Sequence, residues 1–169
     1  YRKPVTDLIL QRIPATLLLV FSAQIIALII GVFLGVVSAQ KPNGLTSHFV
    51  TFIALFGYSA PVFWTGILLL IGFSLQFHWF PVAGMRDVTI EGGLWIKSLD
   101  ILHHLILPMV TLASVFLALY SRLTRATMLE QLRTDYVRTA YAKGVPHRKV
   151  VYQHALKNAL SPVITLAGL

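Results

Sequence analysis

Charged residues are missing from three long stretches of the chain, residues 13–40, 42–85 and 101–121. Apolar residues dominate each stretch, and each is long enough for a helix of about 20 residues, the length that crosses roughly 30 Å of hydrocarbon. Apolar residues fill all sides of a helix in these stretches, as is typical of a helix in lipid. The pattern predicts an all-α integral membrane protein, a polytopic helical bundle.

We expect three complete spans and the start of a fourth within one transmembrane domain, residues 1–169. The spans are placed at residues 14–39, 48–75, 105–121 and from 159 onward. Pro14 suits the first turn of a helix, so residues 1–13 are expected to form an interfacial helix that leads into the first span. Gly31 and Gly35 form a GxxxG pair that allows a neighbouring helix to approach closely. Residues 76–103 are expected to form a loop.

Composition supports the membrane interpretation. Hydrophobic residues make up 56% of the chain, charged residues 12%, and the mean hydropathy is +0.75. The net charge of +8 could suggest a nucleic-acid partner, but three apolar runs serve no purpose in such a protein, and we expect membrane lipid and no nucleic acid. The chain has no cysteine, which excludes disulfides and thiolate sites from it. Since it starts at Tyr1 without a signal-like segment, we interpret it as an internal piece of a longer protein.

Basic residues predict the orientation, because Lys and Arg concentrate in cytoplasmic loops. One side of the expected topology carries nine of them: Lys41, Arg122, Arg125, Arg133, Arg138, Lys143, Arg148, Lys149 and Lys157. The other side carries five, Arg2, Lys3, Arg12, Arg86 and Lys97, accompanied by Asp7, Asp87, Glu91 and Asp100. The segment 122–157 is therefore expected to face the cytoplasm.

That cytoplasmic segment reads as two helices joined by a turn. A short helix is expected from Asp135 to Lys143, capped by Thr134 or Asp135, with Val137, Ala140 and Tyr141 on one face. Gly144 ends it in a left-handed conformation, and Pro146 follows. A second helix starts near Pro146, and its expected inner residues are Val150, Val151, Leu156 and Ala159. The segment is either a solvated connector or a surface that docks on a partner, and its length and patterned composition favour docking.

The same segment resembles the EAA loop of binding-protein-dependent ABC importer permeases. Gly144 falls on the family glycine, Thr139 and Ala140 fall on the two alanines, and Leu156 falls on the leucine of the following motif. Three positions depart from that motif: Arg138 replaces Glu, His154 replaces Ile and Lys157 replaces Pro. With these departures, "DYVRTAYAKG" and "HALKNALSPVI" are similar to the dipeptide/oligopeptide/nickel branch, as are "FGYSAPVFWTGILLL" and "HWFPVAGM", so the similarity covers nearly the whole chain.

The resemblance implies a type I permease fold, multi-pass in the cytoplasmic (inner) membrane of a bacterium, and a coupling role for the cytoplasmic segment. The ATPase-coupling residues are then Asp135, Arg138, Thr139, Ala140, Lys143, Gly144 and Leu156. Implied partners are a second permease subunit, homologous or identical, two cytoplasmic ABC ATPase domains and an extracytoplasmic solute-binding protein. No G-x-x-x-x-G-K-[ST] loop occurs in the chain, so ATP would be used by partner subunits and no cofactor is expected here. The solute is a peptide, nickel or a related small solute.

Proline in the second span marks a candidate translocation path or hinge. Pro61 lacks an amide hydrogen and follows Gly57, so the helix is expected to kink there. The candidate path or hinge residues are Tyr58, Ser59, Pro61, Phe63 and Trp64. An ordinary packing kink filled by aromatic side chains is the alternative.

Two other classes of protein compete with the permease: an intramembrane enzyme such as a protease, and a membrane anchor that transports nothing. The six histidines invite a metal site, but His103 and His104 are adjacent and point about 100° apart on a helix. No acidic residue lies in the apolar runs beside the available serines, and no G-x-S-x-G motif occurs. We therefore expect neither a metal nor a catalytic site.

Overall fold

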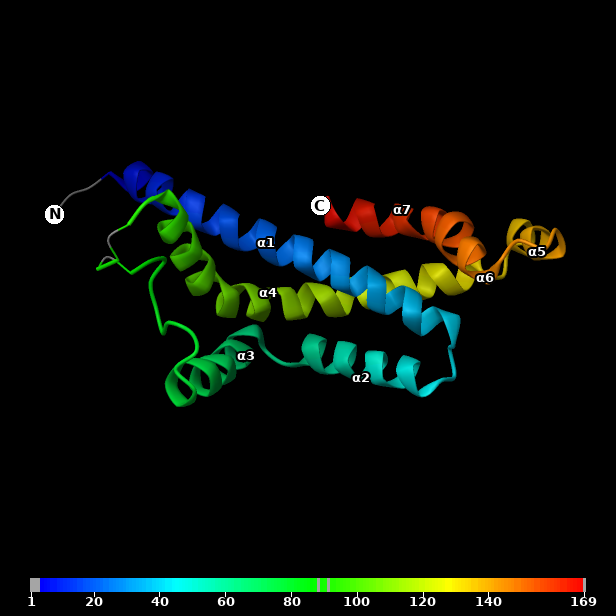
Figure 1. Ribbon diagram of the computed structural model, residues 1–169, viewed down its shortest axis with the longest axis horizontal. Helices are drawn as coiled ribbons and strands as arrows, with labels where there is room; N and C mark the ends of the chain where they lie inside the picture. Colours follow the sequence, from blue (N-terminus) through cyan, green and yellow to red (C-terminus); the bar gives the residue numbers. More distant parts are fainter. Residues whose placement is uncertain (1–3, 88, 91, 169) are drawn as a thin grey trace. The chain divides into compact units, whose positions relative to one another are not determined.

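A computed structural model describes residues 4–87, 89–90 and 92–168, so Arg2, Lys3 and Glu91 of the charge comparison lie outside it. The described residues form helices, turns and loops and no strand. In chain order the elements are α1 (Val5–Gln40), α2 (Leu45–Ser59), α3 (Val62–Leu69), the π-helix η1 (Leu70–Gln76), α4 (Leu94–Gln131), α5 (Asp135–Ala142), α6 (His147–Lys149), the π-helix η2 (Val150–Ala155) and α7 (Leu156–Ala167) (Figure 1). The all-α prediction is confirmed.

Two of the described helices, α1 and α4, are long and apolar enough to cross a membrane. A third span results if α2 and the helical run Val62–Gln76 count as one broken crossing. These helices coincide with the three stretches in which the sequence predicts complete spans, and the fourth expected span, from 159 onward, stays a prediction.

The expected start of the first helix and the expected end of the loop 76–103 are wrong. α1 begins at Val5, and Pro14 lies inside it rather than at its start. Proline is tolerated inside membrane helices because side chains and small local adjustments satisfy the carbonyl that loses its partner. The loop is also shorter than expected, since α4 begins at Leu94. Isolated Lys97 and Asp100 do not interrupt the helix, because eight of the 14 residues 94–107 are Leu or Ile.

The segment 122–157, which is expected to face the cytoplasm, forms a separate turn only in its later part. α4 continues ten residues beyond the apolar run, from Arg122 to Gln131, instead of ending at Ser121. Residues 122–131 contain good helix formers such as Leu, Met, Glu and Arg, so the helix has no local reason to stop where the apolar run ends. Only the later part of the predicted segment turns away from α4.

The expected kink at Pro61 is a complete break. α2 ends at Ser59 and α3 starts at Val62, and Pro61 has ψ 132°, far from the helical value. The amide of Thr65 donates to the Pro61 carbonyl at 3.1 Å, which makes Pro61 the N-cap of α3. The π-helix η1 then continues α3, and wide helical turns of this kind are often found at functional sites.

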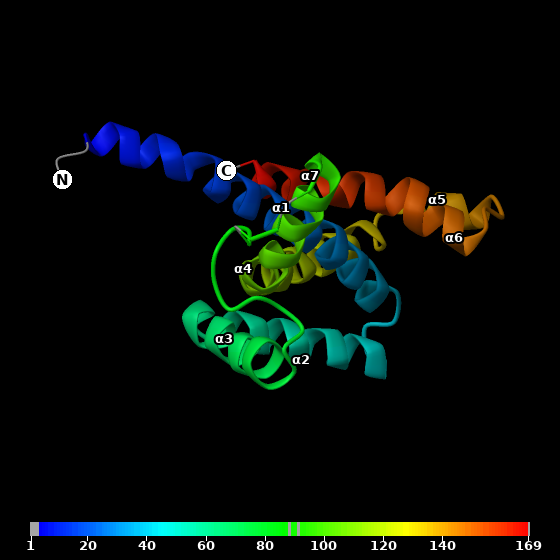
Figure 2. The ribbon, with the colours of Figure 1, turned by 60° about the vertical axis from the view of Figure 1, so that its left-hand side comes forward.

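The described residues group into two units. The first comprises residues 4–25 and 60–113 and includes α3, η1 and the loop that leads to α4 (green in Figure 2). Hydrogen bonds hold that loop: Ser74 Oγ donates to the Pro81 carbonyl at 3.3 Å, and the Asp87 amide donates to Asp100 Oδ2 at 2.7 Å. The loop is therefore fixed to its own unit at both ends.

The second unit comprises residues 26–59 and 114–168. In this unit the backbone of α1 at Gly31 and Gly35 packs directly against α4. A Cβ added to Gly31 would lie 2.8 Å from Tyr120 Cβ, and one added to Gly35 would lie 2.5 Å from Thr124 Cβ and 2.8 Å from the Ser121 carbonyl oxygen. The prediction of a close helix approach is confirmed.

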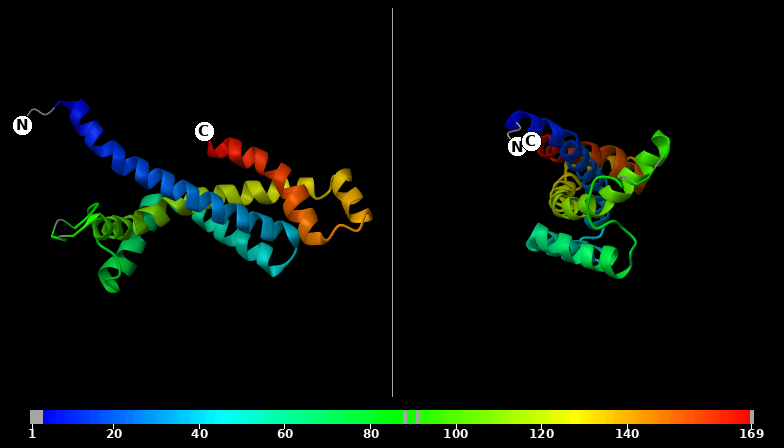
Figure 3. Two further views of the ribbon diagram at one scale, coloured as in Figure 1. Left: turned by 45° about the horizontal axis from the view of Figure 1, so that its top comes forward. Right: turned by 90° about the vertical axis from the view of Figure 1, so that its left-hand side faces the viewer.

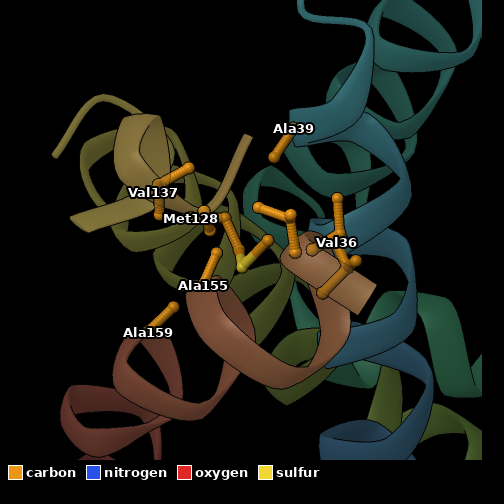
Figure 4. Packing of buried hydrophobic residues seen from close by; sticks show 9 residues of the cluster. Val36, Ala39, Met128, Val137, Ala155 and Ala159 are labelled. Atoms are coloured by element: carbon orange, nitrogen blue, oxygen red, sulfur yellow. The ribbon is translucent and has the colours of Figure 1, made fainter. Parts of the chain in front are cut away.

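A compact apolar cluster forms the core of the second unit (Figure 4). It gathers alanines, valines and one methionine of α1, α4, α5, η2 and α7: Val36, Ala39, Met128, Val137, Ala140, Val150, Val151, Ala155 and Ala159. Each is at most 8% exposed. This cluster holds α5, η2 and α7 against α1 and α4.

Candidate functional site

The candidate site is the helix–turn–helix segment formed by residues 133–157, which we call the elbow. It contains α5, the turn at Gly144, α6 and η2, and the first residues of α7 (orange to red in Figure 3). The chain runs out along α5, reverses at Gly144 and returns along η2 and α7. All seven predicted coupling residues lie on it.

Thr134 is the N-cap residue of α5, but its side chain does not cap the helix as expected. Its hydroxyl donates to the Gln131 carbonyl at 2.6 Å instead. The last carbonyls of α4 have no partner within that helix, and Thr134 satisfies one of them. The predicted cap is therefore wrong in its bonding partner, although the start of the helix is right.

Gly144 ends α5 in the expected left-handed conformation, with φ 74°. The Gly144 amide donates to the Tyr141 carbonyl at 2.9 Å, and the Val145 amide donates to the Ala140 carbonyl at 3.1 Å. This pair of bonds is a Schellman motif, and Val145 packs against the apolar cluster as such motifs favour. The predicted turn is confirmed.

The two faces of α5 differ. Val137 is fully buried and Ala140 is 8% exposed, whereas Tyr141, which is expected on the same face, is 42% exposed. Of the predicted coupling residues, Ala140 belongs to the core and Leu156 packs against it. The exposed members are Asp135, Arg138, Thr139, Lys143 and Gly144. The structure thus divides the predicted set into residues that hold the elbow and residues that a partner can reach.

Two tyrosines tie the elbow together, and neither role is evident from the sequence. Tyr136 Oη donates to Gln131 Oε1 at 2.7 Å and accepts from Asn158 Nδ2 at 3.1 Å. Tyr141 Oη lies 2.7 Å from His147 Nδ1, and their rings stack 6.0 Å apart. These bonds link α4, α5 and α7 around the turn, so α5 is held as a rigid projection.

The exposed surface of the elbow is basic. Arg133, Arg138, Lys143, Arg148 and Lys149 are all exposed, and Asp135 is the acidic residue among them. Arg138 lies 3.4 Å from Asp135, but both side chains are largely exposed, so this pair contributes little to stability. The charges are therefore available to an acidic surface on a partner.

The predicted path residues are divided between the units. Tyr58 and Ser59 end α2 in the second unit, whereas Pro61, Phe63 and Trp64 belong to the first. Phe63 lines an apolar pocket of about 510 Å³ in the first unit, whose wall also includes Val82, His104 and Pro108. Tyr58, Phe63 and Trp64 are 58%, 69% and 42% exposed, so these large aromatic side chains do not fill a core of the described chain.

If the chain has the transport role that the resemblance implies, Pro61→Ala should reduce solute uptake severalfold while the protein still inserts and assembles. Alanine restores an amide donor and removes the ring, lifting a penalty of about 3 kcal/mol against a continuous helix. Pro14→Ala is the matched control, because α1 is already continuous through Pro14. Uptake measured for both variants checks the expectation, and wild-type uptake in Pro61→Ala would assign the break to packing alone.

The described residues contain no group of three or more His, Asp or Glu placed to hold a metal ion. His104 Nδ1 is 3.2 Å from Asp100 Oδ1, and His103 Nε2 is 2.7 Å from the Trp79 carbonyl oxygen. The His103 ring therefore links the loop before α4 to that helix, whereas His104 contacts a carboxylate one turn away on α4 itself.

Residues 31–169 match the family described as binding-protein-dependent transport system inner membrane component. The chain is 42% identical to an oligopeptide transport system permease protein of Bacillus subtilis over 98% of its length and 51% of that relative. It is 42% identical to a di/tripeptide permease protein of Pseudomonas aeruginosa, over 95% of the chain and 52% of the relative. A dipeptide permease protein of Escherichia coli K12 is 37% identical over 99% and 55%. The chain spans about half the length of these curated relatives.

Proposed function

Because this chain belongs to the binding-protein-dependent transport system inner membrane component family, we propose that it is part of the permease subunit of a peptide importer driven by ABC ATPases. The proposed subunit forms the path for peptides across the cytoplasmic membrane of a bacterium and couples that path to ATP hydrolysis by partners. Its partners are a second permease subunit, two ATPase domains and an extracytoplasmic solute-binding protein.

The elbow is the observation that carries the coupling role. A solvated connector has no need of a Schellman turn, two tyrosine hydrogen-bond networks and a buried cluster to hold eight helical residues in place. A lever that transmits the movement of a partner needs this rigidity. Motion at the exposed side of α5 would pass through Val137 and Ala140 to Met128 of α4 and Val36 of α1, which share one apolar cluster.

The names of the relatives support peptides over nickel as the solute. Oligopeptide, di/tripeptide and dipeptide permease proteins all match nearly the whole chain at 37–42% identity. The same names argue against an intramembrane enzyme, and a membrane anchor without transport gives no reason for the rigid elbow.

Reconstitution tests the proposed function directly. The full-length protein, its partner permease, the ATPases and the solute-binding protein are placed in proteoliposomes with a radiolabelled dipeptide, an oligopeptide or nickel. We expect uptake of a peptide that stops when ATP is replaced by a non-hydrolysable analogue. Uptake of nickel alone, or uptake without ATP hydrolysis, would contradict the proposal.

A further inference from the structure

Arg122 lies over the exposed ring of Tyr58 in the second unit. Its guanidinium carbon is 4.3 Å from the ring centroid, and Tyr58 is 58% exposed. α2 packs tightly on α4 beside this pair, since a Cβ on Gly57 would lie 3.1 Å from the Ser114 carbonyl oxygen. The charge of Arg122 is therefore placed at the end of α2, next to the break before Pro61.

Arg125, one helical turn further along α4, points to the opposite end of α2. Its guanidinium donates to the Pro42 carbonyl at 3.5 Å, in the turn that precedes α2. α2 has 15 residues, which makes it about 22 Å long. Arg125 thus extends toward the loop between α1 and α2, as long basic side chains near membrane interfaces do. Arg122 extends away from that loop.

No carboxylate of the described residues neutralises Arg122. The sequence contains no Asp or Glu between Asp7 and Asp87, or between Asp100 and Glu130. Glu130 is eight residues further along α4, about 12 Å away along the axis and in the direction opposite to Tyr58. Arg122 itself follows the apolar run 101–121, but its guanidinium lies over Tyr58, which belongs to the apolar run 42–85. An unpaired guanidinium beside a span is costly on a lipid-facing surface and is found instead on the inside of the bundle or on a water-filled cavity.

We propose that Arg122, held over Tyr58, is an anion subsite on the solute path that binds the C-terminal carboxylate of the transported peptide. The proposal rests on the proposed function. A guanidinium that stacks by its face keeps its N–H edge free, and that edge matches a carboxylate with two parallel hydrogen bonds. The terminal carboxylate is the charge that peptides share whatever their side chains, so one arginine serves solutes of different sequence.

The first test measures the anion preference of the site without requiring transport. Ser59 adjoins Tyr58 and is exposed, and the chain has no cysteine of its own. Ser59→Cys, made in the full-length complex with any other cysteines replaced, is treated with an anionic sulfonatoethyl and a cationic trimethylammonioethyl thiosulfonate reagent. Arg122→Gln should lower the ratio of anionic to cationic rates by about fivefold or more, from loss of a nearby unit charge. Arg125→Gln, the matched control, should leave the ratio unchanged.

An equal ratio of anionic to cationic labelling rates in the wild type and in Arg122→Gln would contradict the proposed anion subsite. So would a wild-type ratio that does not favour the anion, because it would mean that an acidic group elsewhere in the complex already pairs with Arg122. This outcome identifies a structural ion pair rather than a solute contact.

The second test compares uptake of a tripeptide with uptake of its C-terminal amide. Arg122→Gln should raise KM for the free acid about tenfold and leave KM for the amide unchanged, whereas Arg125→Gln should change neither. Equal losses for acid and amide would overturn carboxylate recognition. A wild-type complex that takes up no peptide, although its labelling shows the Arg122-dependent preference, would contradict the proposed function and not the anion subsite.

Discussion

Gly35→Leu should prevent the protein from reaching a folded state in the membrane. A Cβ at this position would lie 2.5 Å from Thr124 Cβ and 2.8 Å from the Ser121 carbonyl oxygen, and the second of these belongs to the backbone of α4. Backbone cannot rotate aside, so α1 and α4 would have to separate. Adding methylene groups to a tightly packed contact typically costs about 1–3 kcal/mol, and a whole leucine side chain is a larger addition. The measurement is the yield of monodisperse full-length protein in detergent and its melting temperature.

Gly72→Leu is the matched control, because an added Cβ there has no atom within 4 Å among the described residues. The variant should give wild-type yield and melting temperature. If Gly35→Leu behaved in the same way, the close approach of α1 and α4 at the GxxxG pair would be contradicted.

The sequence predicted those features that depend on neighbouring residues. Gly144 and Pro146 predict the end of one helix and the start of the next, because glycine readily adopts a positive φ and proline fixes its own φ. The buried positions Val137, Val150 and Val151 follow from helical spacing. The break at Pro61 was foreseen as a kink, since local sequence shows where a hydrogen bond is lost and not how far the chain then departs from the helix.

Features that depend on distant residues were missed. Tyr136 is bonded to Asn158, 22 residues away, and nothing in either residue type indicates that pairing. The sequence pattern places residues 122–131 in the cytoplasmic segment because the apolar run ends at Ser121, yet the end of an apolar run does not mark the end of a helix. The opposite directions of Arg122 and Arg125 likewise depend on how α2 packs on α4.

Gly144→Val should abolish peptide uptake while leaving insertion and assembly of the spans intact. The residue adopts φ 74°, a conformation that a β-branched side chain resists by about 1–2 kcal/mol or more. The obstacle is the backbone conformation and not the space available, because nothing lies within 4 Å of an added Cβ. The variant would lose the Schellman bonds and displace α5, whose eight residues carry most of the predicted coupling set.

Gly144→Asn is the matched control, since asparagine adopts the left-handed conformation more readily than other residues with a side chain. It should keep at least about half of the wild-type uptake, because it adds a side chain of similar size at a small conformational cost. Loss of uptake in both variants would mean that any side chain at this position is harmful, and that the left-handed backbone conformation of the turn is not the cause.

The most direct measurement of the coupling role is therefore made on the reconstituted complex of Gly144→Val with its ATPases, solute-binding protein and peptide. Peptide uptake and peptide-stimulated ATP hydrolysis are recorded together. If the elbow is the lever, uptake in Gly144→Val falls to background and ATP hydrolysis no longer responds to the peptide. Gly144→Asn keeps both peptide uptake and peptide-stimulated hydrolysis. Wild-type uptake and wild-type stimulated hydrolysis in Gly144→Val would contradict the coupling role.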